Sequence, residues 1–125
     1  MKVIIAGSRT ITEMNLVNRV IQASGFKITE VVSGKEPRGV DHLGEIWANY
    51  NGIPVKPFPA DWHQYGLAAG PIRNRKMAEY ADAIIAIRSR LGTKSNGTDD
   101  MINQAVDRGL KWCVYIVGLG FVERS

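Results

Sequence analysis

The sequence has very little cysteine and no long hydrophobic run. Its 125 residues include one cysteine, Cys113, which excludes an internal disulfide and fits a reducing compartment, so we expect a cytoplasmic location. No apolar run approaches the roughly 20 residues that a membrane-spanning helix needs. The first residues read as a strand and not as a signal peptide. The sequence therefore predicts one globular domain over residues 1–125 with no membrane partner.

The sequence also lacks a large net charge. The 16 basic and 12 acidic residues leave a net charge of +4, without the clustered basic stripe of a dedicated DNA-binding protein. This balance suits an anionic small molecule and permits only weak contact with nucleic acid. His63 has no second histidine, cysteine or carboxylate at metal-binding spacing, and His42 is interpreted as an ordinary surface residue of a helix. We therefore expect no metal site and no cofactor.

Strand patterns alternate with helix patterns along the chain. Strands are predicted at 2–6, 28–32, 53–58, 83–87 and 112–117, with helices at 12–24, 41–51 and 97–109 and a further helix that begins near Pro71. This alternation predicts an α/β fold, a single Rossmann-like three-layer sandwich with a five-stranded, mainly parallel sheet in the order 3-2-1-4-5. Prolines in the third strand place it toward an edge. Residues 118–125 receive no assignment.

Small and polar residues follow four of the predicted strands, and ligands of such sheets bind past the carboxyl ends of the strands. Gly7, Ser8 and Arg9 follow the first strand, and Gly97 and Thr98 begin the helix after the fourth; both segments suit a phosphate. Alternatively, they form a plain turn with a solvated arginine and a simple helix cap. Neither the Walker A pattern nor G-x-G-x-x-G is present, so common nucleotide-binding fingerprints are missing.

The loops after the second and third strands carry carboxylates and an aromatic residue. Asp41 either caps its helix or accepts a hydrogen bond from a ribose hydroxyl. Asp61 and Trp62 either contact a base or belong to a packed loop. None of these signals is specific alone, but all of them fall on one edge of the predicted sheet.

The stretch from Ala69 to Ile87 reads as a turn, a helix and a buried strand. Arg73, Asn74, Arg75 and Lys76 are predicted in or near the first helical turn. Cations are unfavourable there because the helix dipole places partial positive charge at the N-terminus. This arrangement predicts a bound anion, such as a phosphate, at the start of the helix.

Five ordered motifs together resemble the YspA-type family of the SLOG superfamily, which is found in bacteria and their phages. They are G-S-R (7–9), S-G…R-G-V-D (33–41), F-P-A-D-W (58–62), A-G-P-I-R-N-R-x-M (69–77) and K-S-x-G-T (94–98). The resemblance implies a Rossmann-like domain that senses or sequesters a nucleotide or a nucleotide-derived phosphorylated ligand, and a homo-oligomer. The predicted ligand-contacting residues are Gly7, Ser8, Arg9, Ser33, Gly34, Arg38, Gly39, Asp41, Asp61, Trp62, Gly70, Arg73, Asn74, Met77, Lys94, Ser95, Gly97 and Thr98.

The superfamily also contains phosphoribohydrolases, whose motif is P-G-G-x-G-T-x-x-E. Gly97 and Thr98 match it, but Met101 stands at the glutamate position and P-G-G is missing. A glycosidic hydrolase needs a carboxylate near the anomeric carbon, and Asp41 and Asp61 are the candidates, with Asp99 and Asp100 nearby in sequence. Binding is therefore favoured over catalysis. An N-glycosidase acting on a nucleotide is the alternative, and single-stranded DNA binding, as in the DNA-processing protein A family, is the third hypothesis.

Overall fold

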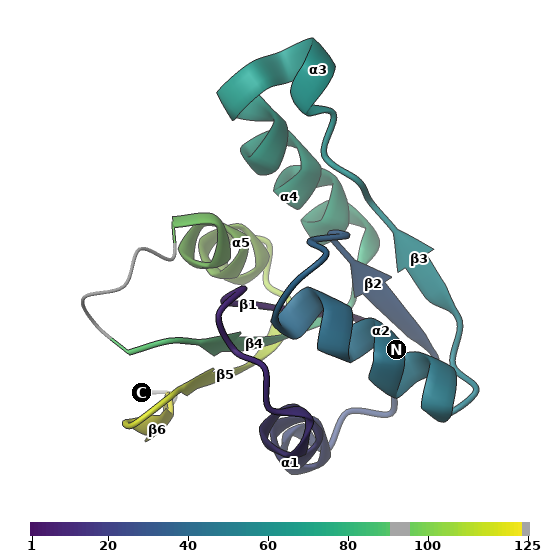
Figure 1. Cartoon of the computed structure of the whole chain (residues 1–125), viewed down its shortest axis with the longest axis vertical. Coiled ribbons are helices and arrows are strands. Elements are labelled where there is room, and N and C mark those ends of the chain that lie inside the picture. The colour runs from purple at the N-terminus through teal and green to yellow at the C-terminus, as the bar shows by residue number, and fades with distance from the viewer. Residues whose placement is uncertain (91–95, 124–125) are drawn as a thin grey trace.

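A six-stranded sheet forms the centre of the fold (Figure 1). The computed structural model describes residues 1–90 and 96–123. The strand order is β3-β2-β1-β4-β5-β6, and every pair except β5–β6 is parallel. The strands are β1 Lys2–Gly7, β2 Glu30–Ser33, β3 Val55–Pro57, β4 Ala83–Arg88, β5 Lys111–Ile116 and β6 Gly120–Phe121. The predicted α/β class and the order 3-2-1-4-5 are confirmed, with β3 at one edge.

The strand β6 corrects the prediction of five strands. It lies in the unassigned tail and pairs antiparallel with β5. Gly118 and Gly120 both adopt positive φ, of 84° and 95°, and so allow the chain to reverse directly after β5. The rings of Tyr115 and Phe121 then meet edge to face, with centroids 5.0 Å apart. A two-residue strand is too short to give a periodic pattern in the sequence.

Helices cover both faces of the sheet. The helices α1 Met14–Ser24 and α2 Val40–Tyr50 pack on one face, and α4 Ala69–Tyr80 and α5 Asn96–Asp107 pack on the other. Alternate residues of β1 serve the two cores: Val3 and Ile5 point toward α1 and α2, and Ile4 and Ala6 toward α4 and α5. This double burial explains why the central strands read as unbroken apolar runs. No helix in the described part of the chain could span a membrane.

The long loop predicted at 59–70 contains two short helical elements. These are α3 Trp62–Tyr65 and the 3-10 turn η1 Gly66–Ala68, which leads directly into α4. The side chain of Asp61 caps α3 by accepting a hydrogen bond of 3.0 Å from the Gln64 N–H. Figure 1 shows α3 and the start of α4 extending beyond the carboxyl end of β3. This segment forms an arm at the ligand edge of the sheet.

The topological switch point lies between β1 and β4, where Gly7 pairs with Ile87. The Ser8 N–H donates to the Ile87 carbonyl at 3.0 Å, and the Ser8 hydroxyl accepts from the Ser89 N–H at 2.8 Å. These bonds hold the two strand ends together. From this point the chain of β1 turns toward α1 on one face, and that of β4 leads to α5 on the other, which opens a crevice between them.

Candidate functional site

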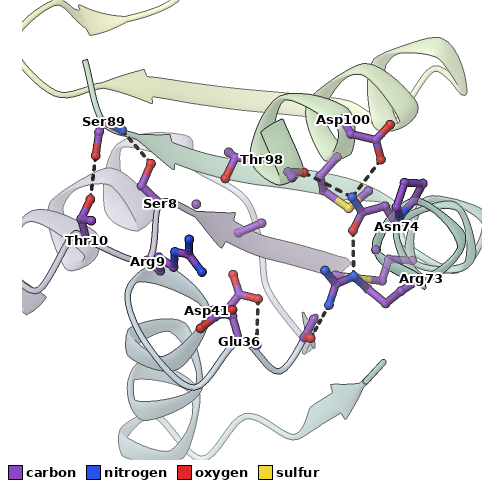
Figure 2. A pocket seen from close by; sticks show the side chains of 18 of the residues that line it. Ser8, Arg9, Thr10, Glu36, Asp41, Arg73, Asn74, Ser89, Thr98 and Asp100 are labelled. Carbon is purple, nitrogen blue, oxygen red and sulfur yellow. Dashed lines mark hydrogen bonds between the residues drawn. The ribbon is translucent and has the colours of Figure 1, made fainter. Parts of the chain in front are cut away.

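A cleft of about 800 Å³ opens at the carboxyl edge of the sheet, above the switch point (Figure 2). Residues from the ends of β1 and β4, the loop after β2, the α3 arm and the starts of α4 and α5 line it. The cleft brings together most of the predicted ligand-contacting residues, namely Gly7, Ser8, Arg9, Gly34, Asp41, Trp62, Gly70, Arg73, Asn74, Met77, Gly97 and Thr98.

The remaining predicted residues lie elsewhere. Of those that the structure describes, Ser33, Arg38, Gly39 and Asp61 are outside the cleft lining. Arg38 pairs with Glu36 at 3.6 Å, and Asp61 caps α3. Lys94 and Ser95 lie outside the described residues.

The Ser33 side chain stabilises the loop after β2 through hydrogen bonds. Its hydroxyl donates to Glu45 at 2.6 Å and accepts from the Lys35 N–H at 3.1 Å, while the Lys35 ammonium pairs with Glu45 at 2.8 Å. Lys35 adopts a positive φ of 63°, which is uncommon for a residue with a side chain. The network thus holds a tight turn that places Gly34 at the cleft wall.

Two glycines allow the β1 loop and the start of α2 to approach closely. A Cβ on Gly7 would overlap the Ile87 carbonyl oxygen and lie 2.6 Å from the Val40 side chain. Gly39 has a φ of +74°, and a Cβ there would overlap the backbone of Ser8 and Arg9. Both positions therefore require glycine on steric grounds. Their importance to the site is that they bring the Arg9 loop beside the N-terminus of α2.

Asp41 is buried in the cleft wall, with 8% of its surface exposed. It is the second residue of α2, and Gly39 occupies the N-cap position, so the expected capping role of Asp41 is wrong. Its carboxylate instead accepts from the Glu36 N–H at 3.4 Å. Burial raises the pKa of Asp41 from 3.8 to about 6, although the Glu36 N–H and the Arg73 charge oppose this rise. A carboxyl that titrates near neutral pH therefore faces the cleft.

Arg73 lies in the second turn of α4, because the helix begins at Ala69. The predicted crowding of cations in the first turn is therefore wrong. The Arg73 guanidinium donates through Nη1 to the Gly34 carbonyl and through Nε to Asn74 Oδ1 at 2.8 Å. Burial lowers its pKa, against the attraction of Asp41, Glu36 and Asp100. Arg73 is thus held between the β2 loop and α4 and faces acidic groups of the protein itself.

Asn74 connects α4 to the start of α5. Only 3% of it is exposed, and its Nδ2 donates to the Gly97 carbonyl at 3.2 Å and to Asp100 Oδ2 at 2.9 Å. Gln104 donates to the same carboxylate oxygen at 3.0 Å. Because its Oδ1 also accepts from Arg73, Asn74 uses both ends of its amide to fix the right-hand wall of the cleft in Figure 2.

The opposite part of the cleft offers hydrogen-bond donors. Thr98 is in the first turn of α5 and 8% exposed, yet its hydroxyl has no hydrogen-bond partner among the described residues. Gly97 beside it has open space where a Cβ would stand. Arg9 projects from the β1 loop toward the same space (Figure 2), and it forms no ion pair with any residue that the structure describes. A helix N-terminus, a hydroxyl and a guanidinium thus converge.

An apolar wall from the α3 arm closes the outer side of the cleft. Trp62 and Leu67 line it, although both are largely exposed, at 57% and 94%. The Trp62 ring lies against Gly70, where a Cβ would stand 3.4 Å from the ring. An exposed indole at the rim of a polar cleft is suited to stacking on a planar group.

Sequence reasoning missed Glu36 as a cleft residue. Glu36 and Asp100 line the cleft as well as Asp41, with Glu36 beside Asp41 and Asp100 beside Asn74 (Figure 2). The signal that could have indicated Glu36 is its place in the loop after the second strand, which carries ligand residues in such sheets. Within the described residues, no group of three or more histidine, cysteine or carboxylate side chains is arranged to hold a metal ion.

Comparison with known proteins gives one result. The family model of the YspA, cpYpsA-related SLOG family matches residues 1–65, just over half of the chain. No curated protein and no solved structure matches the sequence. The matched part includes the Arg9 loop, Gly34 and Asp41, and therefore part of the cleft described above. The chain belongs to the YspA, cpYpsA-related SLOG family.

Proposed function

We propose that the cleft binds a nucleotide or a nucleotide-derived phosphorylated ligand, which the protein senses or sequesters. The observation that carries the proposal is the hydroxyl of Thr98, a largely buried residue that lines the cleft; this hydroxyl has no partner among the described residues and lies beside Gly97 and across from Arg9. Family membership supports the same general class of ligand.

The position of each group suggests how such a ligand would lie. A phosphate would occupy the space between Arg9 and the N-terminus of α5, where backbone N–H groups and the helix dipole favour negative charge. The sugar hydroxyls would donate to Asp41, and the base would stack on Trp62. The cleft thus offers donors at Arg9 and Thr98 and an acceptor at Asp41, which fits a ligand with these two halves.

Arg9→Ala provides the test, because Arg9 is exposed and supports no part of the fold that the structure describes. A charge-assisted contact to phosphate contributes about 1.5–3 kcal/mol, so we expect about 10- to 100-fold weaker binding. Affinity would be measured by calorimetry after a thermal-shift screen of nucleotides, including cyclic and dinucleotide compounds. Arg19→Ala, on the exposed side of α1, is the matched control. Equal affinity of Arg9→Ala and the native chain would contradict the proposal.

Asp41 favours a second candidate function, the cleavage of an N-glycosidic bond. A buried carboxyl with a pKa of about 6 is suited to general acid or base work near neutral pH, and Asp100 supplies another carboxylate at the same cleft. Incubation with nucleotides, followed by chromatography and mass detection, separates the two functions. Free base that accumulates with the native chain, and not with Asp41→Asn, would indicate an enzyme. Ligand recovered intact would indicate a binding protein.

A further inference from the structure

The charges along the cleft limit how much negative charge its ligand can carry. Among the described residues, the ionisable lining groups are two guanidiniums, Arg9 and Arg73, and three carboxylates, Glu36, Asp41 and Asp100. The part of the wall that the structure describes therefore carries more acidic than basic groups, and it is not a basic pocket that would neutralise a polyphosphate chain.

The two guanidiniums are not equally available. Two nitrogens of Arg73 already donate to the Gly34 carbonyl and to Asn74, and its charge faces Asp41, Glu36 and Asp100. Arg9 has no such partners among the described residues. One guanidinium, together with Thr98 and the start of α5, therefore serves an incoming anion, which is enough for a single phosphate group.

The carboxylates oppose further negative charge. Glu36 is close enough to Asp41 for its charge to raise the pKa of that carboxyl, and in Figure 2 both lie across the cleft from Thr98. A second or third phosphate that extends from the Arg9 subsite would approach this acidic wall and would be repelled. Sugar hydroxyls and amino groups, by contrast, would donate to it.

We infer that the cleft is selective for a ligand with one phosphate group, joined to a hydroxyl-bearing sugar, and that Glu36 is a residue that discriminates against di- and triphosphates. The inference rests on the proposed function and deepens it. It assigns a specificity role to a side chain that the sequence motifs do not include.

The test compares the mono-, di- and triphosphates of adenosine, guanosine, cytidine and uridine within each base. Affinities are measured by calorimetry at constant ionic strength with EDTA, since Mg²⁺ would mask the phosphate charge. We expect the monophosphate to bind about tenfold more tightly than its di- and triphosphate. In Glu36→Gln this ratio should fall about threefold or more, because the substitution keeps the shape and removes the charge.

Glu79→Gln is the control, because it makes the same change in net charge on an exposed part of α4 outside the cleft lining. It should leave the ratio unchanged. Di- or triphosphates that bind as tightly as the monophosphate would overturn the inference while the proposed function stands. A ratio that Glu36→Gln does not alter, or that Glu79→Gln alters equally, would also overturn it. Failure of every nucleotide to bind the native chain would instead refute the proposed function, and this inference with it.

Discussion

Replacement of Asp41 by asparagine should stabilise the protein at high pH. The pKa of this buried carboxyl is raised from 3.8 to about 6, and each pH unit corresponds to about 1.36 kcal/mol, so ionised Asp41 costs about 3 kcal/mol of folding free energy. Between these two pH values the folded state holds a proton that the unfolded chain has released. Stability therefore falls as the pH rises from 3.8 to 6 and stays lower above that range.

Asparagine has the same shape and can still accept from the Glu36 N–H, but its amide hydrogens need partners of their own. We therefore expect Asp41→Asn to gain about 2 kcal/mol at pH 8, and the gain to shrink by about 2 kcal/mol between pH 8 and pH 4. Urea denaturation of both proteins at each pH measures this difference, in which the other titrating groups cancel.

Asp61→Asn is the matched control, since Asp61 is exposed and asparagine caps a helix equally well. Its stability relative to the native chain should not change with pH in the same way. The reasoning is wrong if Asp41→Asn is no more stable than the native chain at pH 8, or if its gain in stability is the same at both pH values. Burial would then not destabilise the ionised carboxylate of Asp41.

Four further substitutions test the frame of the cleft. Gly7→Ala should cost about 3 kcal/mol of stability or prevent folding, because its methyl group would overlap the Ile87 carbonyl. Gly97→Ala adds a methyl group in open space on a helix, so it should stabilise the fold by about 0.5–1 kcal/mol and weaken nucleotide binding. Thermal melts measure the changes in stability, and calorimetry measures the change in binding. Asn74→Ala should lose about 2–3 kcal/mol in urea denaturation, since it leaves buried groups on both helices unpaired. Ser33→Ala should lose about 1–2 kcal/mol in the same assay, because it removes two hydrogen bonds of the β2 turn.

The order of the five long strands could be predicted because each left a clear physical signal. The runs at 3–6 and 83–87 are apolar at every position, which indicates burial on both faces and hence the centre of the sheet. Right-handed crossovers then leave few arrangements. The strand β6 was missed because its two residues cannot show alternation, and the helix α3 because its four residues make little more than one helical turn. Their formation depends on glycine turns and a cap, which act locally.

The sequence could predict which loops form the candidate site, but not which side chains of those loops face the cleft. Loops that follow parallel strands must meet at one edge, and the cleft lies there. Ser33 is a cleft candidate in sequence, but its hydroxyl turns away to Glu45. Whether a side chain on such a loop faces the ligand or its own support depends on contacts with residues distant in sequence, such as Arg73 with Gly34.

The position of Asp41 also bears on what the cleft is for. A neutral side chain there would make the fold more stable above pH 6. The carboxylate does not cap the helix, and it forms no ion pair with any residue that the structure describes. Arg73 relieves part of this cost, but burial outweighs its attraction. Hydrogen bonds from a ligand would stabilise the Asp41 carboxylate, because they would replace the hydrogen bonds that water donates to it in the unfolded chain. Ligand hydroxyls or amino groups at Asp41 would therefore recover in binding the free energy that folding gives up, which is the balance expected where stability is exchanged for function.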